Sequence, residues 1–179
     1  MLKFIHAADF HLDSAFAALP PEKAAEAFRI LRELGTPCLI HQIPYNMLNR
    51  AHELQGSFRL LEHEQIGGIV FSPLAQGLLT NRYLDGIPAD SRIMRNGFLK
   101  KEALTPAVLA KVRNLNEVAS GRGQTLAEMA IAWLLNRPGV TSALIGASRP
   151  EQIRDVVAGL ANLDFTEAEL ARIEAILAE

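Results

Sequence analysis

The chain has 179 residues, and its shares of hydrophobic (49%) and charged (21%) residues are close to those of average soluble globular proteins. This composition excludes an intrinsically disordered chain. With 18 basic and 20 acidic residues, the net charge of -2 gives no electrostatic reason to bind nucleic acid or an anionic membrane, and we expect neither as a partner. No stretch approaches the roughly 20 apolar residues of a membrane span, and the first residues lack the apolar core of a signal peptide. We therefore expect a cytoplasmic protein.

Four elements are expected in the first part of the chain. They are a helix over 20–35, a strand over 38–42, a helix over about 58–65 and a strand over 69–72. Gly35 and Pro37 end the first helix, and the glycine pair 67–68 ends the second. The single cysteine, Cys38, lies in an apolar stretch and is expected to be a small core residue rather than a reactive thiol.

A long irregular stretch follows over about 81–105, of a length that is usually functional or mobile. The elements expected after it are helices over 106–121, 125–138, 151–159 and 168–177, and a strand over 140–145. Thr105 and Thr125 are expected to cap helices, and Thr166 with Glu169 matches a capping box. Strands that alternate with helices predict an α/β fold with a parallel sheet. Only three strands are clear, whereas a closed β/α barrel typically has eight strands and about 250 residues.

Two loops that follow strands are candidate ligand sites, because β/α folds bind ligands at the carboxyl ends of their strands. The turn 145–151 puts backbone amides, the Ser148 hydroxyl and the Arg149 guanidinium at a helix N-terminus, which suits a phosphate group. The alternative is an ordinary connection in which Ser148 caps the helix. The second loop, 71–79, has a glycine that permits close backbone approach, and its alternative is a tight turn that buries two leucines. The residues alone leave both alternatives open.

Four segments resemble consecutive motifs of the aldo-keto reductase family. They are LGTPCLIHQ at 34–42, YNMLNR at 45–50, FSPLAQGLLT at 71–80 and SALIGASRPEQ at 142–152. The resemblance covers about 28–179 and is strongest to the branch with potassium-channel β-subunits and bacterial glyoxal-type reductases. It implies a partial TIM-type (β/α) barrel, made of the last three β/α units with a possible N-terminal strand.

The resemblance also implies roles for ten residues in holding a nicotinamide cofactor. Gln42 would bind the nicotinamide carboxamide, and Phe71 would stack near the nicotinamide ring. The pyrophosphate path would be lined by Ser72, Leu74, Gln76 and Gly77. The adenosine end would be held by Gly146, Ser148, Arg149 and Gln152. Ser148 and Arg149 suit a 2′-phosphate, which favours NADP(H) over NAD(H). Asp155 and Val156 stand where the family commonly has Glu-Asn, so weak binding is expected.

The catalytic Asp, Tyr, Lys and His of the family belong to the first four strands of its barrel, which have no counterpart in this chain. Tyr45 and Tyr83 are the only tyrosines, and neither matches the proton-donating position. We therefore expect no catalytic residues and a truncated chain that is inactive alone. The leading interpretation is an NADP(H)-linked oxidoreductase of carbonyl substrates by family. The alternative is a non-enzymatic cofactor-binding or interaction module.

The first residues carry a second resemblance, to the calcineurin-like phosphoesterases and their DNA-repair exonuclease branch. Asp9 and His11 match the Asp-x-His that supplies two ligands of a two-metal site, but no later segment resembles the other ligand motifs, so no metal site is expected. Three other histidines are interpreted as ordinary surface or turn residues: His41, His52 and His63. A metal-dependent phosphoesterase fragment is the weaker functional alternative.

The chain is thus expected to join a phosphoesterase-like leader, 1–27, to a reductase-like part, 28–179. Three clear strands and a possible leader strand over 3–7 would leave an open parallel sheet with unpaired edges. Two copies could together supply the eight strands of a barrel. We therefore predict a homo-oligomer rather than a monomer.

Overall fold

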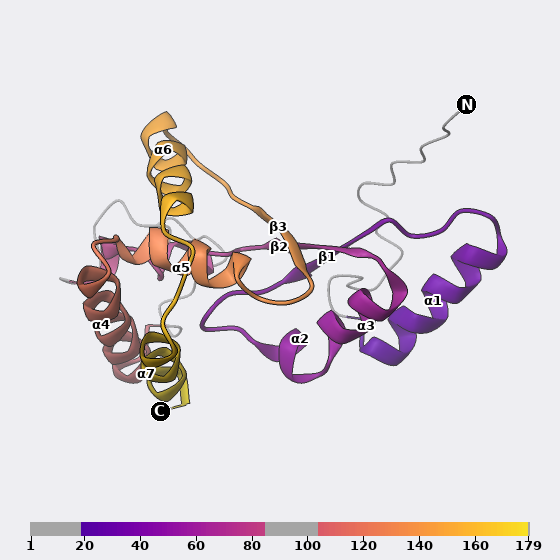
Figure 1. Ribbon diagram of the computed structural model, residues 1–179, viewed down its shortest axis with the longest axis horizontal. Coiled ribbons are helices and arrows are strands. Elements are labelled where there is room, and N and C mark those ends of the chain that lie inside the picture. Colours follow the sequence, from indigo (N-terminus) through magenta and orange to yellow (C-terminus); the bar gives the residue numbers. More distant parts are fainter. Residues whose placement is uncertain (1–18, 85–103, 179) are drawn as a thin grey trace.

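The computed structural model describes residues 19–84 and 104–178, which have an α/β fold (Figure 1). The strands are β1 (Ile40–Pro44), β2 (Gly67–Phe71) and β3 (Val140–Leu144). The α-helices are α1 (Pro21–Glu33), α2 (Ala51–Leu54), α3 (Ser57–Glu64), α4 (Pro106–Gly121), α5 (Leu126–Leu135), α6 (Pro150–Ala158) and α7 (Glu167–Ala178). Within the described residues, no helix is both long and apolar enough to cross a membrane.

The three strands form one parallel sheet in the order β1-β2-β3, which confirms the predicted α/β fold with a parallel sheet. Strand β2 lies in the centre and pairs with both neighbours. Each crossover between neighbouring parallel strands is expected to be right-handed, so the connecting helices fall on the same face of the sheet. Accordingly, α3 packs against β2 and α5 packs against β3.

Burial separates the two faces of the sheet. Ile43 and Val70 point toward the helices and are fully buried. On the opposite face Ile40 is 57% exposed and Leu144 is 52% exposed. We call this second face the open face, because its residues in the three strands are exposed or only partly buried. Its residues, taken from the pairing register, are Ile40, Gln42, Pro44, Gly67, Ile69, Phe71, Ser142 and Leu144.

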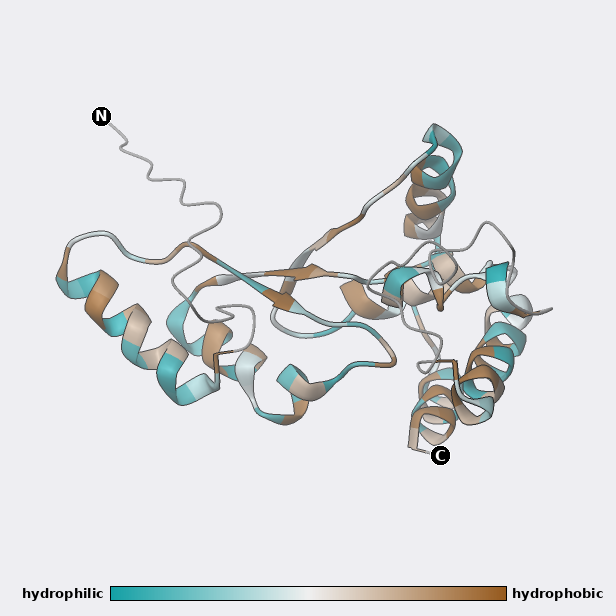
Figure 2. Cartoon of the chain, turned by 180° about the vertical axis from the view of Figure 1, so that it is seen from behind, coloured by the Kyte–Doolittle hydropathy of each residue, from teal (hydrophilic) through white to brown (hydrophobic). Residues whose placement is uncertain are grey.

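Helix α5 forms the centre of the hydrophobic core, and Figure 2 shows hydrophobic and hydrophilic residues interleaved along the helices, as expected for elements with one buried face. Trp133 of α5 is fully buried, and the Tyr45 ring stacks on it with 5.8 Å between ring centroids. Thr125 caps α5 as predicted and, with Glu128, forms a capping box. The predicted caps of α4 and α7, Thr105 and the Thr166–Glu169 pair, are also confirmed.

The region before β2 differs from the sequence prediction. The glycine pair 67–68 does not end α3 but begins β2. Helix α3 ends at Glu64, and its C-cap residue Gln65 adopts a left-handed conformation with φ of 57°. Gly68 is needed in the strand because a Cβ there would lie 2.3 Å from the carbonyl oxygen of Gly139. In addition, the short helix α2 was not predicted, and β1 begins two residues later than expected.

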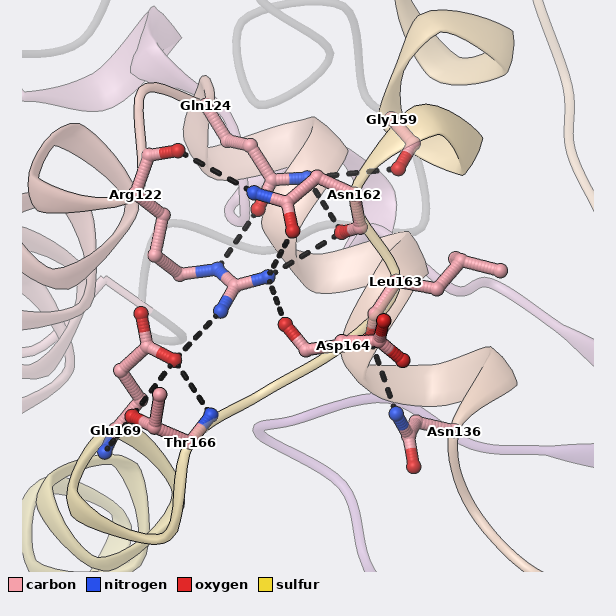
Figure 3. Close-up of polar contacts among 9 residues, drawn as sticks. All are labelled: Arg122, Gln124, Asn136, Gly159, Asn162, Leu163, Asp164, Thr166 and Glu169. Carbon is pink, nitrogen blue, oxygen red and sulfur yellow. Dashed lines mark hydrogen bonds and ion pairs between the residues drawn. The ribbon is translucent and has the colours of Figure 1, made fainter.

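Arg122 joins the α4–α5 turn to the segment between α6 and α7 (Figure 3). Its side chain is 3% exposed, and its Nη1 donates to the Glu169 carboxylate at 2.8 Å. Its Nη2 donates to the carbonyl oxygen of Asp164 at 2.9 Å, and its Nε donates to the Gln124 side chain at 2.8 Å. The guanidinium also lies 3.7 Å from the ring centroid of Phe165. One cation thus satisfies several acceptors that the packing of these helices removes from water.

Replacing Arg122 with alanine should lower the free energy of unfolding by about 2–4 kcal/mol, because several acceptors lose their shared donor together. Urea denaturation followed by circular dichroism measures the change. Arg29→Ala is the matched control, since Arg29 is 59% exposed and pairs with Glu33 at the surface, so its loss should cost less than about 0.5 kcal/mol. Equal effects of the two substitutions would contradict the role given to Arg122.

Candidate functional site

The three parallel strands end at the same edge of the sheet. The pairing register aligns the last residues of the strands, Pro44, Phe71 and Leu144. The loops that follow them therefore begin side by side at the carboxyl edge of the sheet. The loop 72–77 follows β2, and the turn 145–149 follows β3. The topology therefore brings the sequence-predicted site residues to the carboxyl edge of one sheet, where open α/β folds bind their ligands.

Gln42 and Phe71 lie on the open face, on neighbouring strands. In the register Gln42 pairs with Ile69 and Pro44 pairs with Phe71, and alternate residues of a strand share a face. Gln42 is exposed and Phe71 is half-buried. The structure thus places an amide and an aromatic ring on the same surface, where a planar ligand could contact both.

The loop after β2 is a tight turn with a strained backbone. Four of its residues have positive φ angles: Ser72 (55°), Ala75 (47°), Gln76 (57°) and Gly77 (99°). This conformation is unfavourable for residues other than glycine, and hydrogen bonds inside the loop hold it, including one of 2.8 Å from the Gly77 N–H to the Leu74 carbonyl. Leu79 is fully buried and Leu74 is partly buried against the core. The turn therefore buries both leucines, and its contact with a cofactor stays a prediction.

Asn46 connects the loop after β1 to the loop after β2. Its buried side chain donates from Nδ2 to the Ser72 carbonyl at 2.9 Å, and its Oδ1 accepts from the backbone N–H groups of Leu48 and Asn49 at 3.0 and 2.9 Å. This amide fixes the point at which the strained turn begins. Sequence reasoning placed Asn46 in a motif without giving it a role. The available signal was an asparagine just beyond a strand, where its side chain can bond to nearby backbone.

Gln152 organises the turn between β3 and α6. Its Oε1 accepts from the Ser148 N–H at 2.8 Å, from the Ser148 hydroxyl at 3.2 Å and from the Arg149 N–H at 3.3 Å. The alternative in which Ser148 caps the helix is wrong, because Arg149 occupies the N-cap position. Three donors thus converge on one oxygen at a helix N-terminus, while Gly146, Ser148 and Arg149 are exposed. An anionic oxygen would be bound well by the same donors.

The two candidate loops are built separately. Among the described residues, no hydrogen bond joins the turn after β3 to the loop after β2, and Figure 1 shows the chain running from β3 to α6 as an extended segment.

On α6, Val156 is the buried residue and Asp155 is exposed. Val156 therefore serves the packing of α6, which explains an apolar residue at that position.

Both tyrosines are core residues. Tyr45 is fully buried, and its hydroxyl donates to Glu53 Oε2 at 2.9 Å. Burial, together with the charge of Glu53, raises the pKa of Tyr45. Burial opposes the ionisation of Glu53, but hydrogen bonds from Arg50 and Tyr45 outweigh it and lower the pKa of that carboxyl group. Tyr83 is also buried.

Two of the described histidines, His41 and His52, and the cysteine pack against other residues. His52 is buried and its Nδ1 lies 3.0 Å from the Ser57 hydroxyl, so its interpretation as a surface or turn residue is wrong. His41 is partly buried with its ring edge-on to a phenylalanine, and His63 is exposed. Cys38 is half-buried, and burial raises the pKa of its thiol, as in a packed rather than reactive cysteine. In 19–84 and 104–178, no three His, Cys, Asp or Glu side chains are grouped to hold a metal ion.

This arrangement of parallel strands, crossover helices and candidate ligand loops at the carboxyl edge agrees with a comparison to known families. A model of the Aldo/keto reductase family matches residues 15–178. The chain belongs to the aldo/keto reductase family.

Its relatives include reductases and channel subunits. The chain is 48% identical over 163 residues to L-glyceraldehyde 3-phosphate reductase of Escherichia coli strain K12, a match that covers 89% of this chain and 47% of that protein. It is 40% identical over 121 residues to an Arabidopsis thaliana protein named as a probable voltage-gated potassium channel β subunit, covering 65% of this chain and 37% of that protein. The chain therefore spans less than half the length of these relatives.

The comparisons give no support to the phosphoesterase resemblance of the leader. The family match begins at residue 15, inside the segment predicted as the leader. Asp9, His11 and the possible strand over 3–7 lie outside the described residues, as does most of the stretch 81–105. The predicted boundary between 27 and 28 stays a prediction.

Replacing Asn46 with alanine should loosen the loop after β2, because the Ser72 carbonyl loses its side-chain donor. Amide hydrogen exchange over 72–79 should accelerate about tenfold, which corresponds to about 1.4 kcal/mol of local stability. Asn49→Ala is the control, since Asn49 is exposed and its side chain accepts one long hydrogen bond of 3.4 Å from the Ala51 N–H. Unchanged hydrogen exchange in the Asn46 variant would show that the hydrogen bonds within the loop are enough to keep its conformation.

Proposed function

We propose that this chain is the cofactor-binding part of an NADP(H)-linked oxidoreductase that acts on carbonyl compounds, and that it is inactive by itself. Family membership and the name of the Escherichia coli relative, a reductase of an aldehyde, support the reaction class. A bound NADPH would supply a hydride to the carbonyl carbon. The observation that carries the proposal is the convergence of three donors on one oxygen beside the exposed Arg149.

The turn between β3 and α6 fits the 2′-phosphate of NADP(H). A phosphate oxygen could replace Gln152 Oε1 and accept from the same Ser148 and Arg149 donors. The Arg149 guanidinium adds a positive charge that NADH, without this phosphate, would not use. A Cβ added at Gly146 would meet no atom within 4 Å, so the backbone beside the turn is accessible to the adenosine end.

The open face fits the nicotinamide end. Phe71 offers a ring for stacking, and Gln42 offers an amide that can both donate to and accept from a carboxamide. The pyrophosphate path between the two ends would be lined by Ser72, Leu74, Gln76 and Gly77. Asn46 would act as a positioning residue for this path, because it holds Ser72 in place.

A second candidate function is a cofactor-binding or interaction module without catalysis. Tyr45 and Tyr83, the tyrosines of the chain, are both buried in the core, which favours a chain that holds a cofactor without donating a proton to a carbonyl oxygen. In either function the open face requires cover, and a second copy of the chain is one candidate to provide it.

Arg149→Ala should weaken NADPH binding about tenfold and leave NADH binding almost unchanged, because only NADPH carries the 2′-phosphate. Titration of cofactor fluorescence measures both dissociation constants. Arg154→Ala is the matched control, since Arg154 lies on the same helix, is highly exposed and should affect neither cofactor. An equal loss for NADPH and NADH in the Arg149 variant would contradict the phosphate assignment.

The purified chain should show no NADPH-dependent reduction of small aldehydes above background, because both tyrosines are buried in the core, away from any position from which they could protonate the carbonyl oxygen. Absorbance of NADPH follows the reaction. A turnover that disappears in Phe71→Ala would overturn the proposed inactivity, whereas a contaminating reductase would be insensitive to that change.

A further inference from the structure

We propose that Gln124 is a positioning residue that sets where the turn between β3 and α6 lies. Its side chain holds the opposite end of α6 and thereby fixes the location of the Ser148 and Arg149 donors. This role rests on the proposed function, because the same turn would bind the 2′-phosphate of NADP(H). Gln124 itself would not touch the cofactor.

Helix α6 packs on the rest of the described structure through its C-terminal end. Val156 is its buried residue, and Gly159, which follows the helix, is also buried. Both α6 and the short 3-10 helix Gly159–Ala161 pack against α5. Figure 1 shows the chain entering α6 from β3 at the end away from α5, and the turn there is exposed over 146–149. The phosphate donors therefore lie at the end of α6 that is not packed.

Gln124 forms the polar part of the packed end (Figure 3). It lies between α4 and α5 and is 9% exposed. Its Nε2 donates to the carbonyl oxygen of Asn162 at 3.0 Å and to that of Gly159 at 3.4 Å. Its Oε1 accepts from Arg122 Nε at 2.8 Å, which fixes the orientation of the amide. One buried amide thus ties the end of α6 to the turn between α4 and α5.

Close packing at Gly159 forms the apolar part of the same attachment. A Cβ added there would lie 2.9 Å from the Cα of Glu128, in the first turn of α5. This contact is with backbone, so no side-chain rotation could relieve it. We call Gln124 and Gly159, with these contacts, the anchor of α6.

The length of α6 converts a small rotation at the anchor into a displacement of the phosphate donors. Nine residues make this helix about 13 Å long. A rotation of about 10° would therefore move Ser148 and Arg149 by roughly 2 Å, which is more than a hydrogen bond tolerates. Gln152 holds these donors together, but it belongs to α6 and moves with the helix. Their position relative to the rest of the cofactor path depends on the anchor.

Two substitutions in the full 179-residue chain share one change, the loss of the amide donor to α6. Gln124→Met removes it without adding charge, and Gln124→Glu removes it while keeping an acceptor for Arg122. Both should raise the NADPH dissociation constant about fivefold and the NADH dissociation constant less than about twofold, as measured by titration of cofactor fluorescence. Gln55→Glu is the control, since Gln55 is exposed at the end of α2, and it should leave both constants unchanged.

Gly159→Ala changes the anchor without altering Gln124. It should have the same selective effect on NADPH, because the added methyl group must push the end of α6 away from Glu128. Gly121→Ala is its matched control, since a Cβ at Gly121 in α4 would meet no atom within 4 Å. Circular dichroism and urea midpoints show which variants fold, and agreement between the two kinds of anchor variant separates positioning from a defect of one substitution.

A distance measurement tests the anchor without any cofactor. Spin labels are attached to Arg154→Cys on α6 and His63→Cys on α3, both exposed positions, in a Cys38→Ser background. Double electron-electron resonance should show a broader distribution of distances in the Gln124 variants and in Gly159→Ala than in the labelled chain without them. A role in stability alone would lower the urea midpoint but leave this distribution unchanged in the folded chain.

Unchanged distances in the anchor variants would overturn the positioning role, as would equal losses of NADPH and NADH affinity. Broadened distances together with a selective loss of NADPH affinity would support it. If the unsubstituted chain binds no NADPH, the proposed function fails by itself, because the distance distributions still decide whether Gln124 sets the position of the turn.

Discussion

The parallel pairing of β2 with both of its neighbours determines where the rest of the molecule lies. Parallel strands require long crossovers, and these carry α3, α4 and α5. The same pairing aligns the ends of the three strands, so the candidate ligand loops leave from one edge. The face of the sheet opposite Ile43 and Val70 stays exposed or only partly buried. The position of the candidate site and the exposure of the open face are thus two consequences of one constraint.

The polar groups secure the outer elements to this sheet. Glu174 of α7 accepts hydrogen bonds from Arg50, which lies in the loop after β1, and from Arg137, whose guanidinium lies 4.0 Å from the Trp133 ring centroid. The last helix is therefore tied both to the central helix and to the loop that contains Asn46. Such pairs contribute more when partly buried than at the surface, because solvent screens them less. The geometry of the candidate site depends on contacts made far along the chain.

Sequence patterns predicted the features whose causes are local. Apolar spacing and side-chain caps such as Thr125 located the helices, and short apolar runs located three strands. The glycine pair 67–68 was predicted to end a helix but begins β2. Gly68 is needed there because the Gly139 backbone, distant in sequence, approaches β2, and no local pattern carries that information. The structural role of Gln152 was not predicted: its Oε1 accepts hydrogen bonds from its own turn. Its assignment to the cofactor stays a prediction. Contacts between distant segments account for most of what the sequence did not predict.

The two halves of the candidate site differ in how firmly they are held. The loop after β2 is fixed by Asn46, by its own hydrogen bonds and by buried leucines, whereas the turn after β3 is exposed and is held by one side chain, Gln152. A dinucleotide spanning both would have to order the second half, which reduces affinity by the free energy of that ordering. Anything that orders the turn after β3 before the cofactor arrives would therefore raise cofactor affinity. By the same factor, bound cofactor would stabilise the ordered turn.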